Sequence, residues 1–379
     1  MPKGHVLVTG GAGFIGSHLV DTLLQRGFDV TVLDCLLSQV HGDADMDAEG
    51  WPIYLNPKAR RIKGNILDDG VFERQLAGIT HLAHMAASVG VGQSMANIVD
   101  YTRNNTLAAA VMLEVLSKGG HTVERMAVAS SMSIYGEGEY DCVKCGRIAP
   151  QLRTTEQLAS RKWEVSCPKC DGELEPAPTT ETKPLFPTSI YAISKQDQEQ
   201  LCLVMGRAYG VPTVALRYFN VYGTRQALSN PYTGICAIFS SRLLNGKPPL
   251  IFEDGEQSRD LVHVSDIVHA NLLAMETDNA DFQALNIGSG TSLTVNQIAT
   301  LLAAELGSEV KAEIEGQYRE GDIRHCFANI KKARTLLGYE PKVQLQDGVK
   351  ELMAWVRQQT AADRVEECKM ELAARSLMR

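Results

Sequence analysis

The fold is decided near the start of the chain, by residues 5–34, which read HVLVTGGAGFIGSHLVDTLLQRGFDVTVLD. They predict a strand, a glycine turn, an amphipathic helix over about 17–26 and a second strand. The turn contains Gly10, Gly13 and Gly16, spaced G-x-x-G-x-x-G. Glycine permits a positive φ and lets the backbone approach a pyrophosphate, which the first amides of the helix attract. These could be turn glycines with no ligand, but their place between strand and helix favours a dinucleotide site.

An acidic residue ends this unit. Asp34 closes the second predicted strand. A carboxylate there can accept hydrogen bonds from the adenosine ribose hydroxyls, and it repels a 2′-phosphate. We therefore expect NAD rather than NADP.

Strands and helices continue to alternate after Asp34. Strand-like runs occur at 60–66, 78–87 and 125–131, with a helix predicted over 101–118. Strands separated by helices predict a doubly wound parallel sheet of the α/β class.

The composition excludes several classes of protein. The 379 residues carry a net charge of −8 without a block of lysine or arginine, which argues against nucleic-acid binding. No run of apolar residues is long enough for a membrane span, and residues 2–9 do not resemble a secretory signal. We expect a cytoplasmic protein whose nine cysteines are thiols or metal ligands rather than disulfides.

A second helix carries candidate chemistry. It is predicted to end at Gly210, and it places Tyr191 and Lys195 four residues apart on one face. An ammonium beside a phenol stabilises the phenolate and lowers its pKa, which makes a base that works near neutral pH. Ser131, at the end of the strand before the insertion described below, can hold the reacting oxygen. Taken alone, Tyr191 and Lys195 would be interpreted as a pair on the surface of a helix. Because they follow a predicted nucleotide-binding unit in the sequence, they indicate a catalytic site.

Together these segments resemble the extended short-chain dehydrogenase/reductase superfamily, specifically its nucleotide-sugar epimerases and dehydratases. The resemblance rests on TGGAGFIG, YAISK, HMAASVGVGQS, LRYFNVYG, RDLVHVSDI, LNIGSG and YREGDIRH, and it runs from residue 5 to about 355. It implies a Rossmann-type fold with NAD as cofactor, a nucleotide-diphosphate sugar as substrate, and a homodimer formed through helices 101–118 and 191–209.

The resemblance also implies roles for individual residues. Ser131 matches the catalytic serine or threonine, Tyr191 the base, and Lys195 its partner, which also holds the nicotinamide ribose. The cofactor-binding positions are Gly10, Gly13, Phe14, Ile15, Gly16, Asp34, Asn65, Ile66, Ala86, Ala87, Asn105, Tyr191 and Lys195. The substrate-binding positions are Ser131, Ser133, Asn220, Arg259 and Arg319, with the two arginines on the diphosphate.

Two of the matched positions depart from the family pattern. Asn65 and Ile66 stand where the family usually has Asp-Ile, so weaker adenine recognition is expected. Cys326 stands where some 4-epimerases have a bulky tyrosine, which predicts an open pocket wall there.

The residues after Ser131 restrict the reaction. Family dehydratases carry an Asp-Glu pair there, but this chain has Met132 and Ser133, which cannot transfer a proton at neutral pH. A 4-keto sugar reductase remains an alternative, although it usually prefers NADPH, which conflicts with Asp34. Epimerisation at C4 through a transient 4-keto intermediate fits best. Epimerases with a cysteine-bearing insertion at this point, such as the one described below, resemble enzymes that act on dTDP-6-deoxyhexoses. That resemblance implies dTDP-L-rhamnose as the substrate and dTDP-6-deoxy-L-talose as the product, with UDP-hexoses second. A non-enzymatic alternative is an NAD-binding regulatory protein.

An insertion of residues 137–180 interrupts the family pattern. It carries two C-x-x-C pairs, Cys142 with Cys145 and Cys167 with Cys170, and contains no histidine. Four thiolates can hold a structural zinc ion, which predicts a zinc ribbon; free thiols, two disulfides and a redox pair are the alternatives. Gly146 and Gly172 are expected to form the tight turns, and the ribbon is expected to overhang the active site.

The chain is expected to form two domains. Residues 1–217 make the NAD-binding domain and contain the insertion. Residues 218–379 make mainly a smaller substrate domain, with parts of 255–290 returning to the first domain.

Overall fold

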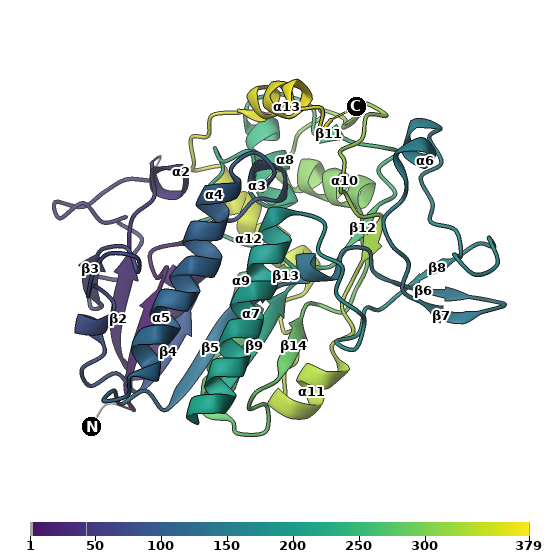
Figure 1. Cartoon of the computed structure of the whole chain (residues 1–379). Coiled ribbons are helices and arrows are strands. Elements are labelled where there is room, and N and C mark those ends of the chain that lie inside the picture. Colours follow the sequence, from purple (N-terminus) through teal and green to yellow (C-terminus); the bar gives the residue numbers. More distant parts are fainter. Residues whose placement is uncertain (1–2, 43, 379) are drawn as a thin grey trace.

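A seven-stranded sheet forms the centre of the protein, as seen in a computed structural model that describes residues 3–42 and 44–378 (Figure 1). Its strand order is β14-β9-β5-β4-β1-β2-β3, and every neighbouring pair is parallel. The strands are β1 (His5–Thr9), β2 (Asp29–Asp34), β3 (Arg60–Lys63), β4 (His81–His84), β5 (Arg125–Ser131), β9 (Thr213–Tyr218) and β14 (Ala284–Ile287). The doubly wound, Rossmann-type parallel sheet predicted from the sequence is confirmed.

Helices cover both faces of this sheet because successive strand side chains point to opposite sides. Val6 and Val8 of β1 join the core under α1 (Phe14–Gln25) and α9 (Val264–Glu276). Leu7, between them, joins the core under α5 (Ala108–Ser117) and α7 (Ile190–Tyr209). Figure 1 shows α5 and α7 side by side on one face of the sheet.

The helix expected over 101–118 is built from three pieces. It begins as α4 (Ile98–Tyr101), widens into a π-helical segment over Thr102–Leu107, and continues as α5. Within the π-helical segment, Asn105 accepts a hydrogen bond from the Ser88 amide at 2.7 Å and donates to the Ser88 carbonyl at 3.0 Å. Short π-helical segments are frequent near functional sites.

A second core lies beyond the carboxyl ends of the central strands. It is formed by α8 (Ile235–Leu244), α10 (Val295–Leu306) and α12 (Leu345–Val356) together with the β10–β13 pair. The remaining strands outside the insertion are β10 (Asn220–Tyr222), β13 (Leu261–His263), β11 (Leu250–Ile251), β16 (Glu313–Ile314), β12 (Ser258–Arg259), β15 (Leu293–Thr294) and β17 (His325–Cys326). The remaining helices are α2 (Ser38–His41), η1 (Glu73–Gln75), α3 (Val91–Ser94), η3 (Met132–Tyr135), α11 (Lys331–Leu337) and α13 (Val365–Ala374).

None of the helices in the described chain combines the length and the apolar character needed to cross a bilayer.

The insertion forms a small antiparallel unit at the side of the molecule, at the right of Figure 1. Its strands, in the order β7-β6-β8, are β6 (Glu139–Cys142), β7 (Gly146–Ile148) and β8 (Glu175–Ala177), with one short helix, α6 (Thr155–Ala159). Its own buried apolar cluster consists of Cys142, Ile148 and Cys167, against which Cys145, Cys170 and Leu174 pack. So small a core cannot stabilise the unit without help.

Candidate active site

A cavity of about 940 Å³ opens at the carboxyl ends of the central strands. Its walls come from the glycine turn, the ends of β2, β4 and β5, the start of α7, and segments of the second core. Ligands of doubly wound sheets bind at this edge, where the strand order reverses, here between β1 and β4. The cavity is therefore the candidate active site.

The glycine turn leaves no room for side chains on its inner surface. Gly10 has φ +68°, and a Cβ there would lie 2.7 Å from the Ala86 nitrogen. A Cβ on Gly16 would lie 2.2 Å from the Gly10 carbonyl oxygen. The turn thus brings bare backbone to the cavity at the amino end of α1, which suits a pyrophosphate.

Asp34 lies at the end of β2, on the wall of the cavity. One carboxylate oxygen accepts a hydrogen bond from the Ala12 amide at 3.0 Å, and the other accepts from the Leu36 amide at 2.9 Å. These bonds fix the carboxylate beside the glycine turn. Because each oxygen has a further lone pair, hydrogen bonds to ribose hydroxyls remain available.

Ser131 and Tyr191 meet on one wall of the cavity. Ser131 ends β5, and its Oγ accepts a hydrogen bond from the Ser133 Oγ at 2.9 Å. Tyr191 begins α7. Burial raises the pKa of Tyr191, and a hydrogen bond with Ser131 opposes that rise. The serine therefore stabilises the phenolate form that a base needs.

Lys195 lies one turn further along α7, but its ammonium points to other partners. It donates to the Ala129 carbonyl and, at 2.5 Å, to Gln198 Oε1. Burial lowers the pKa of Lys195 to about 8. The lowering of the Tyr191 pKa by Lys195 stays a prediction; the largest influence on that pKa here is burial, which raises it.

Behind Lys195 runs a buried chain of hydrogen bonds that the sequence did not reveal. Gln198 Nε2 lies 2.6 Å from His84 Nε2, and His84 Nδ1 lies 2.7 Å from Thr9 Oγ1. The amide orientation is fixed because an ammonium can only donate to Gln198 Oε1. Gln198 therefore donates to His84, whose pKa burial lowers to about 3, so the neutral ring carries its proton on Nδ1. The chain connects the lysine to the residue before Gly10.

This arrangement makes Gln198 a positioning residue for Lys195, and it predicts a shift in the pH profile. Gln198→Leu removes an acceptor from the ammonium, worth about 1.5–3 kcal/mol, and so lowers the Lys195 pKa by about one to two units. Because turnover requires the charged lysine, the loss of activity at alkaline pH should begin at lower pH. The measurement is kcat/KM against pH.

Two further variants give this prediction its control. Gln198→Glu places a carboxylate beside Lys195 and should move the alkaline loss to higher pH. Gln200→Leu, on an exposed position of the same helix, should leave the profile unchanged. Equal effects of Gln198→Leu and Gln198→Glu would show that Gln198 acts only on folding.

The end of the cavity formed by the second core is lined by three carboxamides whose oxygen atoms have no partner in the described part of the chain. The Oδ1 of Asn220 and the Oε1 atoms of Gln226 and Gln257 are buried and have no hydrogen-bond partner among the described residues. Buried polar atoms without partners are costly, which indicates that a polar ligand completes them. Only Asn220 was expected from the sequence, since the two glutamines carry no local pattern.

Both expected arginines also line this end. Arg259 donates to the carbonyls of Ile323 and Arg324 at 2.8 and 2.9 Å. Arg319 pairs with Asp322 at 2.8 Å and stacks over the Phe252 ring. Both guanidinium groups belong to residues that line the same cavity, and such groups pair well with phosphate.

Most of the residues expected from the sequence to bind cofactor or substrate or to shape the pocket wall lie on the wall of this one cavity, and two of them do not. Those on the wall are Gly10, Gly13, Phe14, Ile15, Gly16, Asp34, Asn65, Ile66, Ala86, Ala87, Ser131, Ser133, Tyr191, Lys195, Asn220, Arg259 and Arg319. Asn105 is wholly buried behind the wall, where it fixes Ser88 and Ser194, whereas its neighbour Asn104 lines the cavity. Cys326 is buried against Thr179 and does not open the wall.

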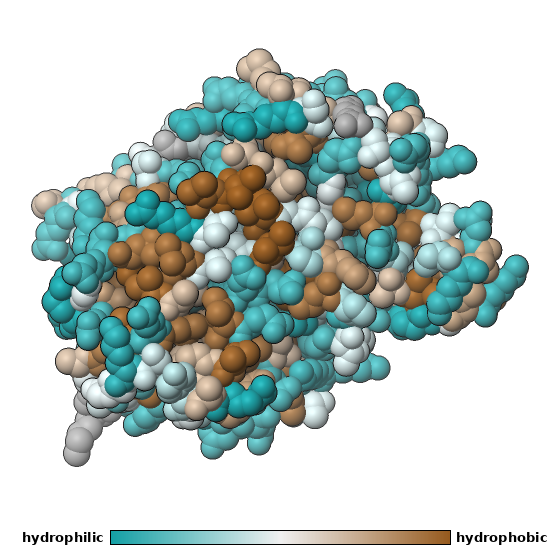
Figure 2. Space-filling model, in the orientation of Figure 1, coloured by the Kyte–Doolittle hydropathy of each residue, from teal (hydrophilic) through white to brown (hydrophobic). Residues whose placement is uncertain are grey.

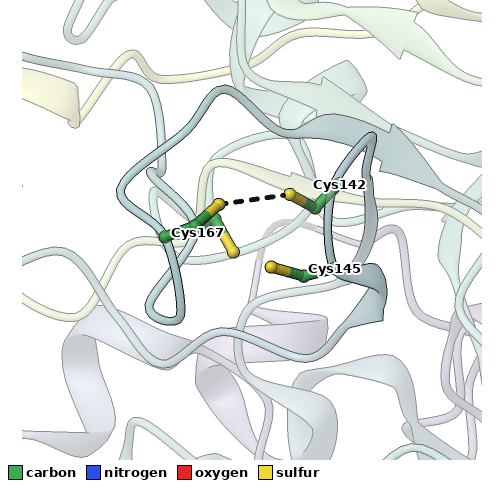
Figure 3. Close-up of side chains that lie close together, drawn as sticks. Cys142, Cys145 and Cys167 are labelled. Atoms are coloured by element: carbon green, nitrogen blue, oxygen red, sulfur yellow. Dashed lines mark hydrogen bonds between the residues drawn. The ribbon is translucent and has the colours of Figure 1, made fainter.

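The four cysteines of the insertion lie together, and Figure 3 shows the side chains of Cys142, Cys145 and Cys167 close to one another. Their sulfur atoms all lie within 4.8 Å of one another, and Cys142 and Cys170 are 3.6 Å apart. A tetrahedral zinc with bonds of about 2.3 Å places its sulfurs about 3.8 Å apart. All four are free thiols, so the alternative of two disulfides does not apply to this structure.

The turns of the insertion differ in one detail from the expectation. The residue after the second cysteine of each pair has a positive φ: Gly146 at +73° and Asp171 at +54°. Gly172 is not the turn residue; a Cβ there would lie 3.3 Å from the Cys170 sulfur. Close approach to the sulfur, rather than backbone freedom, explains this glycine.

The insertion does not overhang the active site. None of the described residues 137–180 lines the cavity. The insertion packs instead behind the segment that carries Arg319, with Gly138 donating to the His325 carbonyl at 2.9 Å. The expectation of an overhang was wrong because it considered only where the insertion leaves the chain.

Comparisons with known proteins agree with this geometry. A family model described as the NAD-dependent epimerase/dehydratase family matches residues 6–288. The dTDP-L-rhamnose 4-epimerase of Burkholderia thailandensis is 30% identical over 356 residues, covering 93% of this chain and 95% of that protein. A putative UDP-glucose 4-epimerase of Methanocaldococcus jannaschii is 32% identical, covering 93% and 98%. The structure of a UDP-glucose 4-epimerase of Thermotoga maritima with UDP-glucose has a TM-score of 0.75 and 33% identity, covering 93% and 99%.

Proposed function

The chain belongs to the NAD-dependent epimerase/dehydratase family, and we propose that it inverts C4 of a nucleotide-diphosphate sugar through a transient 4-keto sugar. The observation that carries this proposal is that Ser131 and Tyr191 meet on the cavity wall, while Met132 and Ser133 follow Ser131 in the sequence. The first pair can move the proton of a sugar hydroxyl. The second offers no acid or base for eliminating water.

Each group has a defined task in this proposal. Ser131 holds the C4 oxygen by a hydrogen bond while Tyr191 removes and later returns its proton. Lys195 supplies positive charge beside the cofactor ribose. NAD, held by the glycine turn and Asp34, supplies the acceptor and donor of the hydride. Arg259 and Arg319 bind the diphosphate.

The division of labour between the two halves of the chain is also a proposal. Residues 1–217 would hold the cofactor, and residues 218–379 mainly the sugar nucleotide. Within the second half, α9 and β14 pack with the central sheet, which fits the expected return of 255–290 to the first domain.

We propose dTDP-L-rhamnose as the substrate, with dTDP-6-deoxy-L-talose as the product. Support comes from the dTDP-L-rhamnose 4-epimerase similar to this chain over nearly its whole length. UDP-hexoses are the second candidate because the other two relatives act on UDP-glucose by name. A 4-keto sugar reductase would consume external NADH, and a regulatory protein would turn over nothing.

The proposal predicts the outcome of a substrate panel. The enzyme should interconvert dTDP-L-rhamnose and its C4 epimer without consuming NAD or NADH, as followed by proton NMR. Faster turnover of UDP-glucose or UDP-galactose would transfer the assignment to UDP-hexoses. Stoichiometric oxidation of NADH with a 4-keto sugar would establish the reductase instead.

We further propose that Cys142, Cys145, Cys167 and Cys170 bind one structural zinc ion. The set contains no histidine and has no open position for a substrate, as expected of a structural site. The bound zinc would replace the core that the insertion lacks. Elemental analysis of reduced protein should find about one zinc per chain, and none would refute the site.

We propose that the protein is a homodimer. The face carrying α4, α5 and α7 exposes apolar side chains, which Figure 2 shows gathered there: Ile98, Val99, Leu107, Leu201 and Val204. An apolar patch rimmed by polar residues marks an interface, and a two-fold dimer lets the same patch meet itself. Sedimentation should give twice the chain mass, with Val204→Glu shifting the protein to monomer.

A further inference from the structure

The insertion contacts a segment that forms part of the substrate end of the cavity. We call residues 319–326 the substrate segment; Arg319, Gly321, Asp322 and Ile323 of it line the cavity. The opposite side of this segment faces the insertion, which itself does not reach the cavity. The substrate segment therefore offers a direct route by which the insertion can affect the site.

Hydrogen bonds to the backbone of the substrate segment attach the insertion to it. The Glu137 carboxylate accepts from the amides of Arg324 at 2.8 Å and His325 at 2.7 Å. Gly138 donates to the His325 carbonyl at 2.9 Å. One carboxylate at the start of the insertion thus fixes two successive peptide groups of the segment.

A buried ion network reinforces this attachment. Arg153 of the insertion makes two bonds to Glu253, at 2.7 and 2.8 Å, and both side chains are 1% exposed. Arg153 also donates to the Asp322 carbonyl at 3.1 Å. Arg324, likewise 1% exposed, bonds to Glu253 at 3.1 Å and Asp254 at 2.6 Å. Breaking one partner of such a network leaves charge buried and unpaired, which is strongly destabilising locally.

The same peptides are held from the cavity side by Arg259. It donates to the carbonyls of Ile323 and Arg324. The insertion and Arg259 therefore form hydrogen bonds with the substrate segment on its two opposite sides. Displacing the segment on one side changes the position of Arg259 on the other, and with it the expected diphosphate site.

The cysteines control the part of the insertion that makes the network. Arg153 and Glu164, which bonds to Arg324 Nε at 2.8 Å, both lie within residues 146–166 between the two cysteine pairs. The regular structure described in that stretch is the end strand β7 and the short helix α6. A metal ion on the four thiolates would fix both ends of this long connection. It would thereby remove most of the conformational freedom that the connection has without the metal.

We propose that the insertion is a metal-closed brace: the metal on its four cysteines fixes Arg153 and Glu164 against the substrate segment and so sets the affinity for the nucleoside diphosphate half of the substrate. Arg153 is a positioning residue in this scheme, and the metal takes no part in the chemistry. The inference rests on the proposed binding of a sugar nucleotide at Arg259 and Arg319.

The test removes the metal from the reduced, full-length protein with a chelator. The dissociation constants of dTDP and UDP are then measured by calorimetry, together with hydrogen exchange at the Arg324 and His325 amides. We expect metal removal to weaken binding of the preferred nucleotide at least about tenfold, a loss of about 1.4 kcal/mol, and to accelerate exchange at both amides. Bound NAD should stay unchanged, since its site lies on the other side of the cavity.

A pair of matched variants separates the brace from the metal. Arg153→Met should reproduce the loss of nucleotide affinity while the protein retains its metal. Arg147→Met replaces a half-exposed arginine of the same insertion, which pairs with Asp141. It should change neither the nucleotide affinity nor the metal content. Should Arg153→Met fail to fold, Arg153→Met with Glu253→Gln takes its place; it removes the excess buried negative charge, and Arg324 keeps Asp254 and Glu164 as partners.

Three results would overturn or redirect the account. Unchanged nucleotide affinity and unchanged exchange in metal-free protein would refute the brace. Absence of metal from reduced wild-type protein would refute it as well. If wild-type protein bound neither dTDP nor UDP, the proposed function would fail, and exchange at Arg324 and His325 would alone decide whether the insertion braces the segment.

Discussion

Replacing Tyr191 with phenylalanine is expected to lower kcat by about 10²–10⁴-fold, the usual contribution of a positioned general base. The substitution removes only the hydroxyl, so the buried ring still fills its place beside Tyr101. Ser131 would then hold a sugar oxygen with no group to take its proton. Turnover of the sugar nucleotide by NMR, with the NAD content of the same preparation, measures the two effects separately.

A tyrosine on the same helix provides the control. Tyr209 is exposed at the far end of α7, and Tyr209→Phe should leave turnover unchanged. Bound NAD should be nearly the same in Tyr191→Phe and wild type. Activity of Tyr191→Phe within about tenfold of wild type would remove Tyr191 from the role of base.

A single methyl group on Gly16 is expected to weaken the binding of NAD. Its Cβ would lie 2.2 Å from the Gly10 carbonyl oxygen and 2.8 Å from the Gly11 Cα, both backbone atoms that cannot swing aside. Overpacking of this kind costs about 1–3 kcal/mol, which corresponds to about a 5- to 150-fold weaker cofactor. The measurement is the NAD retained through purification and its dissociation constant afterwards.

The intrinsic helix propensity of alanine does not explain a loss of NAD binding in Gly16→Ala, so the variant tests the steric effect alone. Gly16 lies inside α1, where alanine is the more favourable residue, so any loss comes from the turn. Thr22→Ala, on the same helix away from the turn, is the control and should retain NAD. Full NAD occupancy in Gly16→Ala would mean that the cofactor does not approach the turn as proposed.

The local part of the site was predictable because its signals are local. The glycine turn, Asp34, and the Tyr191/Lys195 pair each lie within one strand–turn–helix unit or one helix face, where spacing dictates geometry. The parallel sheet followed in the same way from the alternation of strands and helices. These predictions required no knowledge of contacts between distant segments.

What the sequence did not reveal depends on contacts between distant segments. Gln198 meets His84 across 114 positions of the chain, and neither residue belongs to a local pattern. The partners of Lys195 were not predictable either, because the spacing of Tyr191 and Lys195 gives their common face but not the acceptors at Ala129 and Gln198.

The place of the insertion was missed for the same reason. Its ends adjoin the strand of Ser131 and the helix of Tyr191, which suggested a position over the active site. The buried pairing of Arg153 with Glu253, one hundred positions away, turns it toward the substrate segment instead. Charged residues in a polar insertion give no sign of which partners they will be buried against.

The central claim is that C4 is inverted by removal and return of its own hydrogen, without elimination or enolisation. The most direct measurement is NMR of the product formed in deuterated water from dTDP-L-rhamnose, alongside substrate carrying deuterium at C4. The account predicts a C4 epimer without solvent deuterium at C3 or C5, and retention of the C4 deuterium in the labelled product. Solvent deuterium at C3 or C5, or release of a free 4-keto sugar in place of the epimer, would contradict it.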